Sequence, residues 1–115
     1  MVKPHYIPER GDIIRISLDP TKGHEQAKTR PALVLSPRLY NQKASLCLCC
    51  PITSKSKGYP FEVEIAAGDI TGVVLADQIR SLDWQARLVS KLASANEVAL
   101  DQVSEKLYLL ISNKP

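Results

Sequence analysis

Hydrophobic and polar residues alternate in several short segments, and this period of two predicts a chain built mainly of β-strands. In residues 13–19, Ile14, Ile16 and Leu18 share one face of a predicted strand. In residues 61–65, three apolar residues alternate with two glutamates, which is typical of a strand with one face in water. These two segments therefore predict strands of a sheet that has one buried face and one face in water.

Apolar runs bounded by turn residues predict further strands, at residues 31–36, 46–51, 73–77 and, with a weaker pattern, 86–93. Pro37 ends the second strand, and residues 37–43 fit a turn or one short helical turn. Residues 19–29 and 53–60 are polar and contain Pro and Gly, so both segments predict loops.

The last segment changes to a helical period. One stripe of a predicted helix contains Leu100, Val103, Leu107, Leu110 and Ile111. Ser94 and Glu97 have the spacing of a capping box. Short strands followed by one helix predict a mainly β fold with α (α+β), in which a strongly bent sheet or small barrel is closed by that helix.

The length of 115 residues predicts a single domain over residues 1–115. Hydrophobic residues at 44% and charged residues at 23% are ordinary globular values, which argue against a disordered chain. No apolar run approaches the ~20 residues that cross a bilayer. Residues 1–12 lack the apolar stretch of a signal peptide, so we expect a cytoplasmic protein.

The three cysteines, Cys47, Cys49 and Cys50, are crowded into one predicted strand. An odd number of close neighbours makes no disulfide framework, and no histidine lies near enough to complete a zinc site. We expect small buried residues, with Cys47 and Cys49 on one face and Cys50 on the other. No metal or cofactor site is predicted anywhere in the chain.

The net charge of +3 is unevenly distributed. Between Pro20 and Phe61, seven Lys and Arg residues face one acid, Glu25, whereas the remainder is net acidic. The two polar loops of this segment flank neighbouring strands, so they are expected at one rim of the sheet, where they suit a phosphate backbone or an acidic peptide. Aromatic residues are only 5% of the chain, which argues against a stacking platform for RNA and slightly favours a catalytic cleft.

The residue types at the predicted strand ends are those that metal-free RNA cleavage requires. The candidates are His24, Glu25, Gln26, Arg30, Thr53, Ser54 and Asp77. The reaction needs a base for the 2′-hydroxyl, an acid for the leaving oxygen, and cations or hydroxyls for the charged phosphorane. Arg30 stands directly before Pro31, where a loop meets a buried strand, so its guanidinium is expected at the rim.

The order and spacing of seven motifs resemble the MazF/PemK (Kid) family of toxin endoribonucleases. They are GDI (11–13), DPTKGHEQA (19–27), RPALVLS (30–36), YN (40–41), PIT (51–53), SKGYPFEV (56–63) and LADQ (75–78). The resemblance covers most of the chain. The block from Gly23 to Pro31, paired with Pro51 and Thr53, is its specific part.

The resemblance implies an SH3-like small β-barrel with short helices and a C-terminal helix, working as a homodimer. It implies metal-independent cleavage of single-stranded RNA, with messenger RNA expected, at short sequences through a 2′,3′-cyclic phosphate and a free 5′-hydroxyl. The consequence would be inhibition of translation and growth. A cognate antitoxin would neutralise the toxin by laying an acidic, disordered C-terminal segment along the basic groove.

Carried over by position, the resemblance makes Arg30 the catalytic arginine, in proton transfer and in holding the phosphate. Thr53 would stabilise the transition state through its hydroxyl, and Glu25 would orient Arg30 or handle a proton. The loops 20–29 and 54–60 would bind the RNA. The expected RNA-binding residues are Lys22, His24, Gln26, Lys28, Ser54, Lys55, Lys57, Tyr59, Asp77 and Gln78.

One position departs from the Kid branch, which has an arginine where this chain has Leu75. An Asp–Arg–His scheme therefore cannot operate unaltered, and Arg30 with Thr53 is favoured. The roles of His24 and Asp77 in proton transfer stay open. Two other functions also stay open: a gyrase-binding toxin of the same fold that cleaves nothing, and a non-catalytic RNA-binding module. Trp84 and Tyr108 are interpreted as packing residues.

Overall fold

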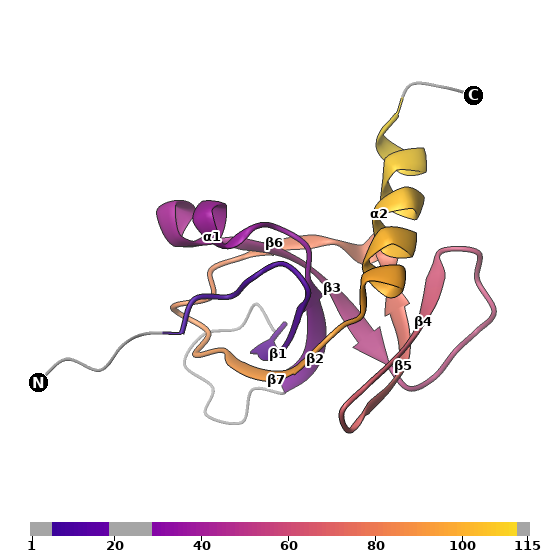
Figure 1. Cartoon of the computed structure of the whole chain (residues 1–115), viewed down its shortest axis with the longest axis horizontal. Helices are drawn as coiled ribbons and strands as arrows, with labels where there is room; N and C mark the ends of the chain where they lie inside the picture. Colours follow the sequence, from indigo (N-terminus) through magenta and orange to yellow (C-terminus); the bar gives the residue numbers. More distant parts are fainter. Residues whose placement is uncertain (1–5, 19–28, 113–115) are drawn as a thin grey trace, which may run out of the picture.

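Seven antiparallel strands curl into a half-barrel, and the last helix stands against one side of it (Figure 1). The structure is a computed structural model that describes residues 6–18 and 29–112. The elements are β1 (Asp12–Ser17), β2 (Thr29–Val34), α1 (Arg38–Ala44), β3 (Cys47–Thr53), β4 (Glu62–Ala67), β5 (Ile70–Leu75), a 3₁₀ helix η1 (Ala76–Gln78), β6 (Arg80–Leu82), β7 (Ser90–Ser94) and α2 (Glu97–Ile111). The expected bent sheet with a terminal helix is confirmed.

Strand β3 holds the sheet together, in the order β4-β5-β3-β2-β1-β7. One edge of β3 pairs with β2, from Cys49 to Pro51. The other edge pairs first with β6 and then, at Ile52 and Thr53, with β5. The three residues of η1 bulge out between these two pairings. Strand β3 therefore connects the β2-β1-β7 part of the sheet with β6 and with the β4–β5 hairpin.

The two faces of β3 belong to two separate hydrophobic clusters. Cys47 and Cys49 pack in one, with residues of β1, β2 and β6 and with Trp84. Cys50 and Ile52 pack in the other, against β4, β5 and α2. The expected faces of the three cysteines are confirmed, and all three thiols are free and buried. Trp84 is a packing residue, as expected, and its indole N–H donates to the carbonyl oxygen of Asn41 at 3.0 Å.

Helix α2 is capped and buried only at its beginning. The side chain of Asn96 accepts a hydrogen bond from the Ala99 N–H at 2.8 Å, so Asn96, and not Ser94, is the N-cap. Leu100 and Val103 are buried against the sheet. The helix then runs past the body of the molecule (Figure 1), which leaves the end of the predicted apolar stripe, Leu110 and Ile111, in solvent.

Several boundaries differ from the sequence expectations. Tyr108 is 60% exposed, so its interpretation as a packing residue is wrong. Strand β3 continues to Thr53, and β5 starts at Ile70, three residues before the predicted strand at 73–77, and ends at Leu75. The weak segment 86–93 contains a turn and only then β7, and β6 was not anticipated. Within the described residues, no helix is long and apolar enough to cross a membrane.

Candidate active site

The first residues of β2 and the last residues of β3 lie at the same end of the half-barrel. In the antiparallel register, Ala32 is opposite Pro51 and Leu33 is opposite Cys50. Continuing that register by two residues brings Arg30 opposite Thr53. Side chains of directly opposed residues point to the same face, with Cβ atoms about 5 Å apart. Continued in this way, the register would bring the Arg30 and Thr53 side chains to the same face of the sheet.

Two effects fix the backbone of Arg30. Arg30 pairs with Ile16 of β1, and the following Pro31 favours an extended backbone at Arg30. Its side chain is exposed, in contrast with the buried Ala32 two residues further on the same face. The guanidinium therefore emerges from a rigid strand into solvent at the rim, as the sequence predicts.

Thr53 is half-buried at the end of β3, and its hydroxyl is oriented by the next turn of the chain. The Lys55 N–H donates to the Thr53 Oγ1 at 3.2 Å. An oxygen that accepts this bond keeps its own proton to donate elsewhere. The neighbouring strand fixes the backbone: a Cβ on Gly72 would lie 2.3 Å from the Thr53 carbonyl oxygen. Only glycine allows β5 to pass this close.

The loop that follows Thr53 carries four of the expected RNA-binding side chains. Ser54, Lys55, Lys57 and Tyr59 are exposed, or nearly so, along it. The loop is tied down by the carboxylate of Glu62, which accepts from the Ser56 hydroxyl at 2.7 Å and from the Lys57 N–H at 2.9 Å. The loop residues are exposed and Glu62 is only half-buried, so hydrogen bonds account for this ordering more than burial does.

Two arginines that sequence reasoning missed lie at this same end. The Arg80 guanidinium donates to the Leu18 carbonyl oxygen at 2.9 Å, and that of Arg87 donates to the Ser17 carbonyl oxygen at 2.7 Å. Ser17 is paired with Thr29, the residue before Arg30. Three guanidinium groups therefore gather around the ends of β1 and β2. No local motif marks Arg80 or Arg87, because their partners are 62 and 70 residues away along the chain.

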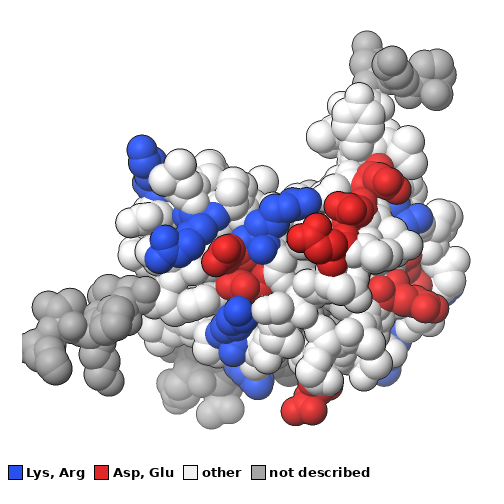
Figure 2. Space-filling view, in the orientation of Figure 1, with Lys and Arg blue, Asp and Glu red and all other residues white. Residues whose placement is uncertain are grey.

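The basic segment of the sequence is split by the fold. Arg38 and Lys43 belong to α1, which follows β2 at its other end, roughly 20 Å from Thr53 by the rise along β3. Figure 2 shows one face of the molecule, on which Lys and Arg spread over the left and centre while several Asp and Glu lie towards the terminal helix. At the Arg30–Thr53 end, Arg80 and Arg87 add to the Arg30, Lys55 and Lys57 side chains of the predicted segment.

Asp77 and Gln78 lie in η1, which packs against α2. Within the described residues, no hydrogen bond or ion pair joins Asp77 to Arg30 or Thr53. Burial raises the pKa of the Cys50 thiol to about 12, and the negative charge of Asp77 adds to this. Cys50 points to the face of β3 opposite that of Thr53. The structure therefore brings Asp77 near β3 without bringing it to the Arg30–Thr53 pair.

Five predicted residues lie outside the described part of the chain: Lys22, His24, Glu25, Gln26 and Lys28. The strands on either side of that segment, β1 and β2, are paired at Ser17 and Thr29. The described residues on either side of segment 19–28 therefore lie together, beside Arg30.

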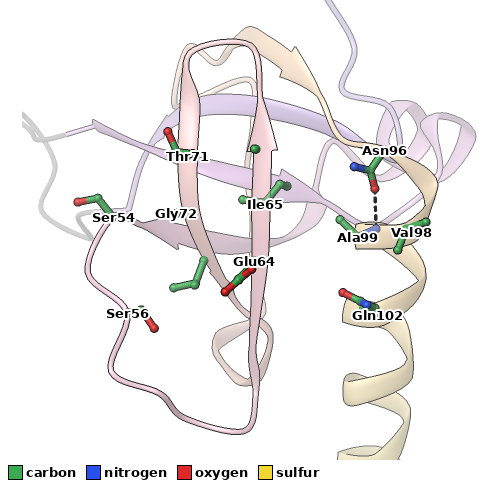
Figure 3. A pocket seen from close by; sticks show the side chains of 12 residues that line it. Ser54, Ser56, Glu64, Ile65, Thr71, Gly72, Asn96, Val98, Ala99 and Gln102 are labelled. Carbon is green, nitrogen blue, oxygen red and sulfur yellow. Dashed lines mark hydrogen bonds between the residues drawn. The ribbon is translucent and has the colours of Figure 1, made fainter.

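A pocket of about 510 Å³ opens beside the loop, between the β4–β5 hairpin and the first turns of α2 (Figure 3). Its lining is mostly uncharged and includes Ser54, Ser56, Asn96 and Gln102, with Glu64 as its acid. In the described residues, no group of three or more His, Cys, Asp and Glu side chains is placed to hold a metal ion.

Comparison with known proteins gives a consistent result. Residues 9–111 match the family described as PemK-like, MazF-like toxin of type II toxin–antitoxin system. The chain is 48% identical to the endoribonuclease toxin MazF of Escherichia coli K12 over 92% of this chain and 96% of that protein.

Solved structures agree with this match. The chain resembles MazF from Deinococcus radiodurans, with a TM-score of 0.84 and 47% identity over 93% of this chain and 98% of that one. It also resembles a MazE–MazF structure from the same organism, with a TM-score of 0.83 and 41% identity over 96% and 100% of the two chains.

Proposed function

This chain belongs to the PemK-like, MazF-like family of type II toxin–antitoxin toxins, and on that premise we propose how it cuts RNA. It is an endoribonuclease toxin, like the MazF of Escherichia coli named above. Those names give no support to a gyrase-binding alternative. The observation that supports the proposal is that the start of β2, which carries Arg30, and the end of β3, which carries Thr53, lie at the same end of the sheet.

The proposed reaction is an internal transesterification of single-stranded RNA. The 2′-oxygen attacks the adjacent phosphorus, the bond from phosphorus to the 5′-oxygen breaks, and the products are a 2′,3′-cyclic phosphate and a 5′-hydroxyl. One proton leaves the 2′-hydroxyl and one joins the leaving 5′-oxygen. Charge accumulates on the two non-bridging oxygens during this step, so fixed donors aimed at them lower the barrier.

Arg30 supplies the planar, permanently charged donor fork that such a phosphate needs. The strand pairing with Ile16 fixes the backbone from which this side chain extends. Thr53 adds a neutral hydroxyl donor. Its oxygen accepts a hydrogen bond from the Lys55 N–H, so the hydroxyl proton is free to be donated to the phosphate. Glu25, from the sequence motif, is the proposed group that orients Arg30 or handles a proton.

Arg80 and Arg87 extend the positive end along which the RNA backbone would run, together with Lys55 and Lys57. Because Arg80 and Arg87 already donate to main-chain oxygens, they act as fixed charges. The same surface suits an acidic antitoxin segment, which we propose as the partner, and we propose a homodimer as the working form.

The proposal is tested by incubating the purified chain with a long single-stranded RNA in excess EDTA and mapping the fragment ends. Discrete cuts with cyclic-phosphate and 5′-hydroxyl ends are expected. Ends carrying a 5′-phosphate, or activity that disappears with the chelator, would contradict the mechanism. No cutting at all by folded protein would contradict the proposed function.

A further inference from the structure

The loop between β3 and β4 is fastened by a carboxylate that the proposed chemistry does not use. Glu62 is the first residue of β4. Its two oxygens accept from the Ser56 hydroxyl at 2.7 Å, from the Lys57 N–H at 2.9 Å and from the Gly58 N–H at 3.1 Å. Three consecutive residues of the loop thus close around one side chain.

Other contacts complete this fastening. The Ser56 hydroxyl also accepts from the Gly58 N–H at 3.3 Å, and the Glu62 N–H donates to the Tyr59 carbonyl oxygen at 3.2 Å. The ammonium group of Lys106, on α2, donates to the Pro60 carbonyl oxygen at 2.6 Å. Each stretch of the loop is therefore held before any ligand arrives.

The Lys57 N–H, the Ser56 hydroxyl and the Gly58 N–H hold the pKa of Glu62 below its ordinary value, the first of them most strongly. The carboxylate is therefore charged at neutral pH. Charge-assisted bonds to backbone N–H groups are stronger than neutral ones, which is why a half-buried acid at the surface can order a loop.

A negative charge beside an RNA-binding loop weakens RNA binding, because it repels phosphates. This repulsion is offset only if the carboxylate makes contacts that a neutral side chain does not make. The geometry shows what that is: the loop amides face Glu62, and the side chains of Lys55, Lys57 and Tyr59 are left exposed.

We propose that Glu62 is a positioning residue for RNA: its carboxylate fixes the Ser56–Gly58 segment, so that the loop meets RNA already ordered. This inference rests on the proposed function. A loop that is ordered in advance loses less conformational entropy on binding, and the affinity is higher for that reason. Glu62 itself contacts no reacting atom, so its effect falls on binding and not on the chemical step.

The test compares Glu62→Gln with Glu64→Gln, which removes the same charge two residues along the same face of β4. Binding is measured with an RNA whose 2′-hydroxyls are methylated, so that it is held without being cut. If only electrostatics matters, both variants bind RNA at least as tightly as the wild type. Positioning instead predicts that Glu62→Gln raises the Kd about tenfold, with kcat on cleavable RNA within about twofold of the wild type.

A second readout needs no RNA. The amide proton shifts of Lys57 and Gly58 in the wild type should titrate with an acid below the ordinary glutamate range, and Glu62→Gln should abolish that titration. Glu64→Gln should leave it unchanged. This signature reports the loop contact itself and would not follow from general destabilisation.

The outcomes separate the two claims. If the wild type cuts RNA and Glu62→Gln binds it as tightly as the wild type does, the inference fails and the proposed function stands. Amide shifts that do not titrate in the wild type would also overturn it. If the wild type neither binds nor cuts RNA, the proposed function fails and the inference fails with it.

Discussion

Ala32 of β2 lies opposite Pro51 of β3, and this register, continued by two residues, would place Arg30 near the start of β2 opposite Thr53 at the end of β3. One side chain contributes a fixed charge and the other a hydroxyl whose oxygen already accepts from the Lys55 N–H. The sheet thereby aligns two different donors on one face without help from a flexible loop. This arrangement leads to separate expectations for the two residues.

Arg30→Ala should lower kcat by roughly 100- to 1,000-fold, because a phosphate-binding donor is removed from the transition state. The side chain is exposed, so the free energy of unfolding should change by less than about 0.5 kcal/mol. Cleavage assays and urea denaturation measure the two effects. The control is Arg38→Ala, which changes an exposed arginine at the start of α1, beyond the far end of β2, and should leave RNA cleavage normal. Wild-type kcat in Arg30→Ala would remove this residue from the mechanism.

Thr53→Val keeps the shape of the side chain and removes the hydroxyl, so kcat should fall by about 100-fold while KM changes little. Thr53→Ser retains the hydroxyl and should recover most of the activity. Single-turnover kinetics with saturating enzyme distinguish the chemical step from binding. A rise in KM with kcat preserved would show that Thr53 binds RNA without acting in the transition state.

Gly72→Ala places a methyl group 2.3 Å from the Thr53 carbonyl oxygen, so β5 or the end of β3 must move. We expect a loss of roughly 2–3 kcal/mol in the free energy of unfolding, accompanied by weaker cleavage. Gly68→Ala is the control, since its Cβ meets only Ala93 at 3.4 Å; its positive φ costs about 1 kcal/mol. Equal effects of the two changes on cleavage would contradict the link from Gly72 to Thr53.

Cys50 predicts a loss of stability at alkaline pH. Burial raises its pKa from an ordinary value of 9.0 to about 12, so the unfolded thiol ionises first. The contribution of the protonated Cys50 thiol to the free energy of unfolding is therefore complete below about pH 9 and is lost as the pH rises through 12. Over that window the wild type should lose up to about 1.4 kcal/mol per pH unit more than Cys50→Ala does. Denaturation series from pH 8 to 11 measure both slopes, and equal slopes would contradict the assignment.

The strands with clear alternation were predictable from the sequence, because a sheet with one wet face leaves a period of two. Strand β6 was not, since a strand of three residues is too short to show a period. The N-cap was misplaced because both Ser94 and Asn96 are good caps, and only the position of the Asn96 side chain beside the Ala99 N–H distinguishes them. The exposure of Tyr108 depends on how far α2 extends past the sheet, which no local pattern reports.

The candidate site was predictable where it rests on motifs and strand ends, as with Arg30 and Thr53. Arg80 and Arg87 were missed because they reach the site only through long-range pairing with the end of β1. Glu62 was read simply as the wet face of a strand. Its contacts depend on the path of the loop, and alternation carries no information about that path.

The central position of β3 also bears on when the enzyme becomes active during synthesis. One of the clusters that hold β3 needs Ala99, Leu100 and Val103 of the last helix. A nascent chain that has not yet released residues 97–111 lacks the helical part of this cluster, so β3 is incompletely packed on that face. Arg30 and Thr53 are therefore synthesised well before the helix whose packing completes the support of β3.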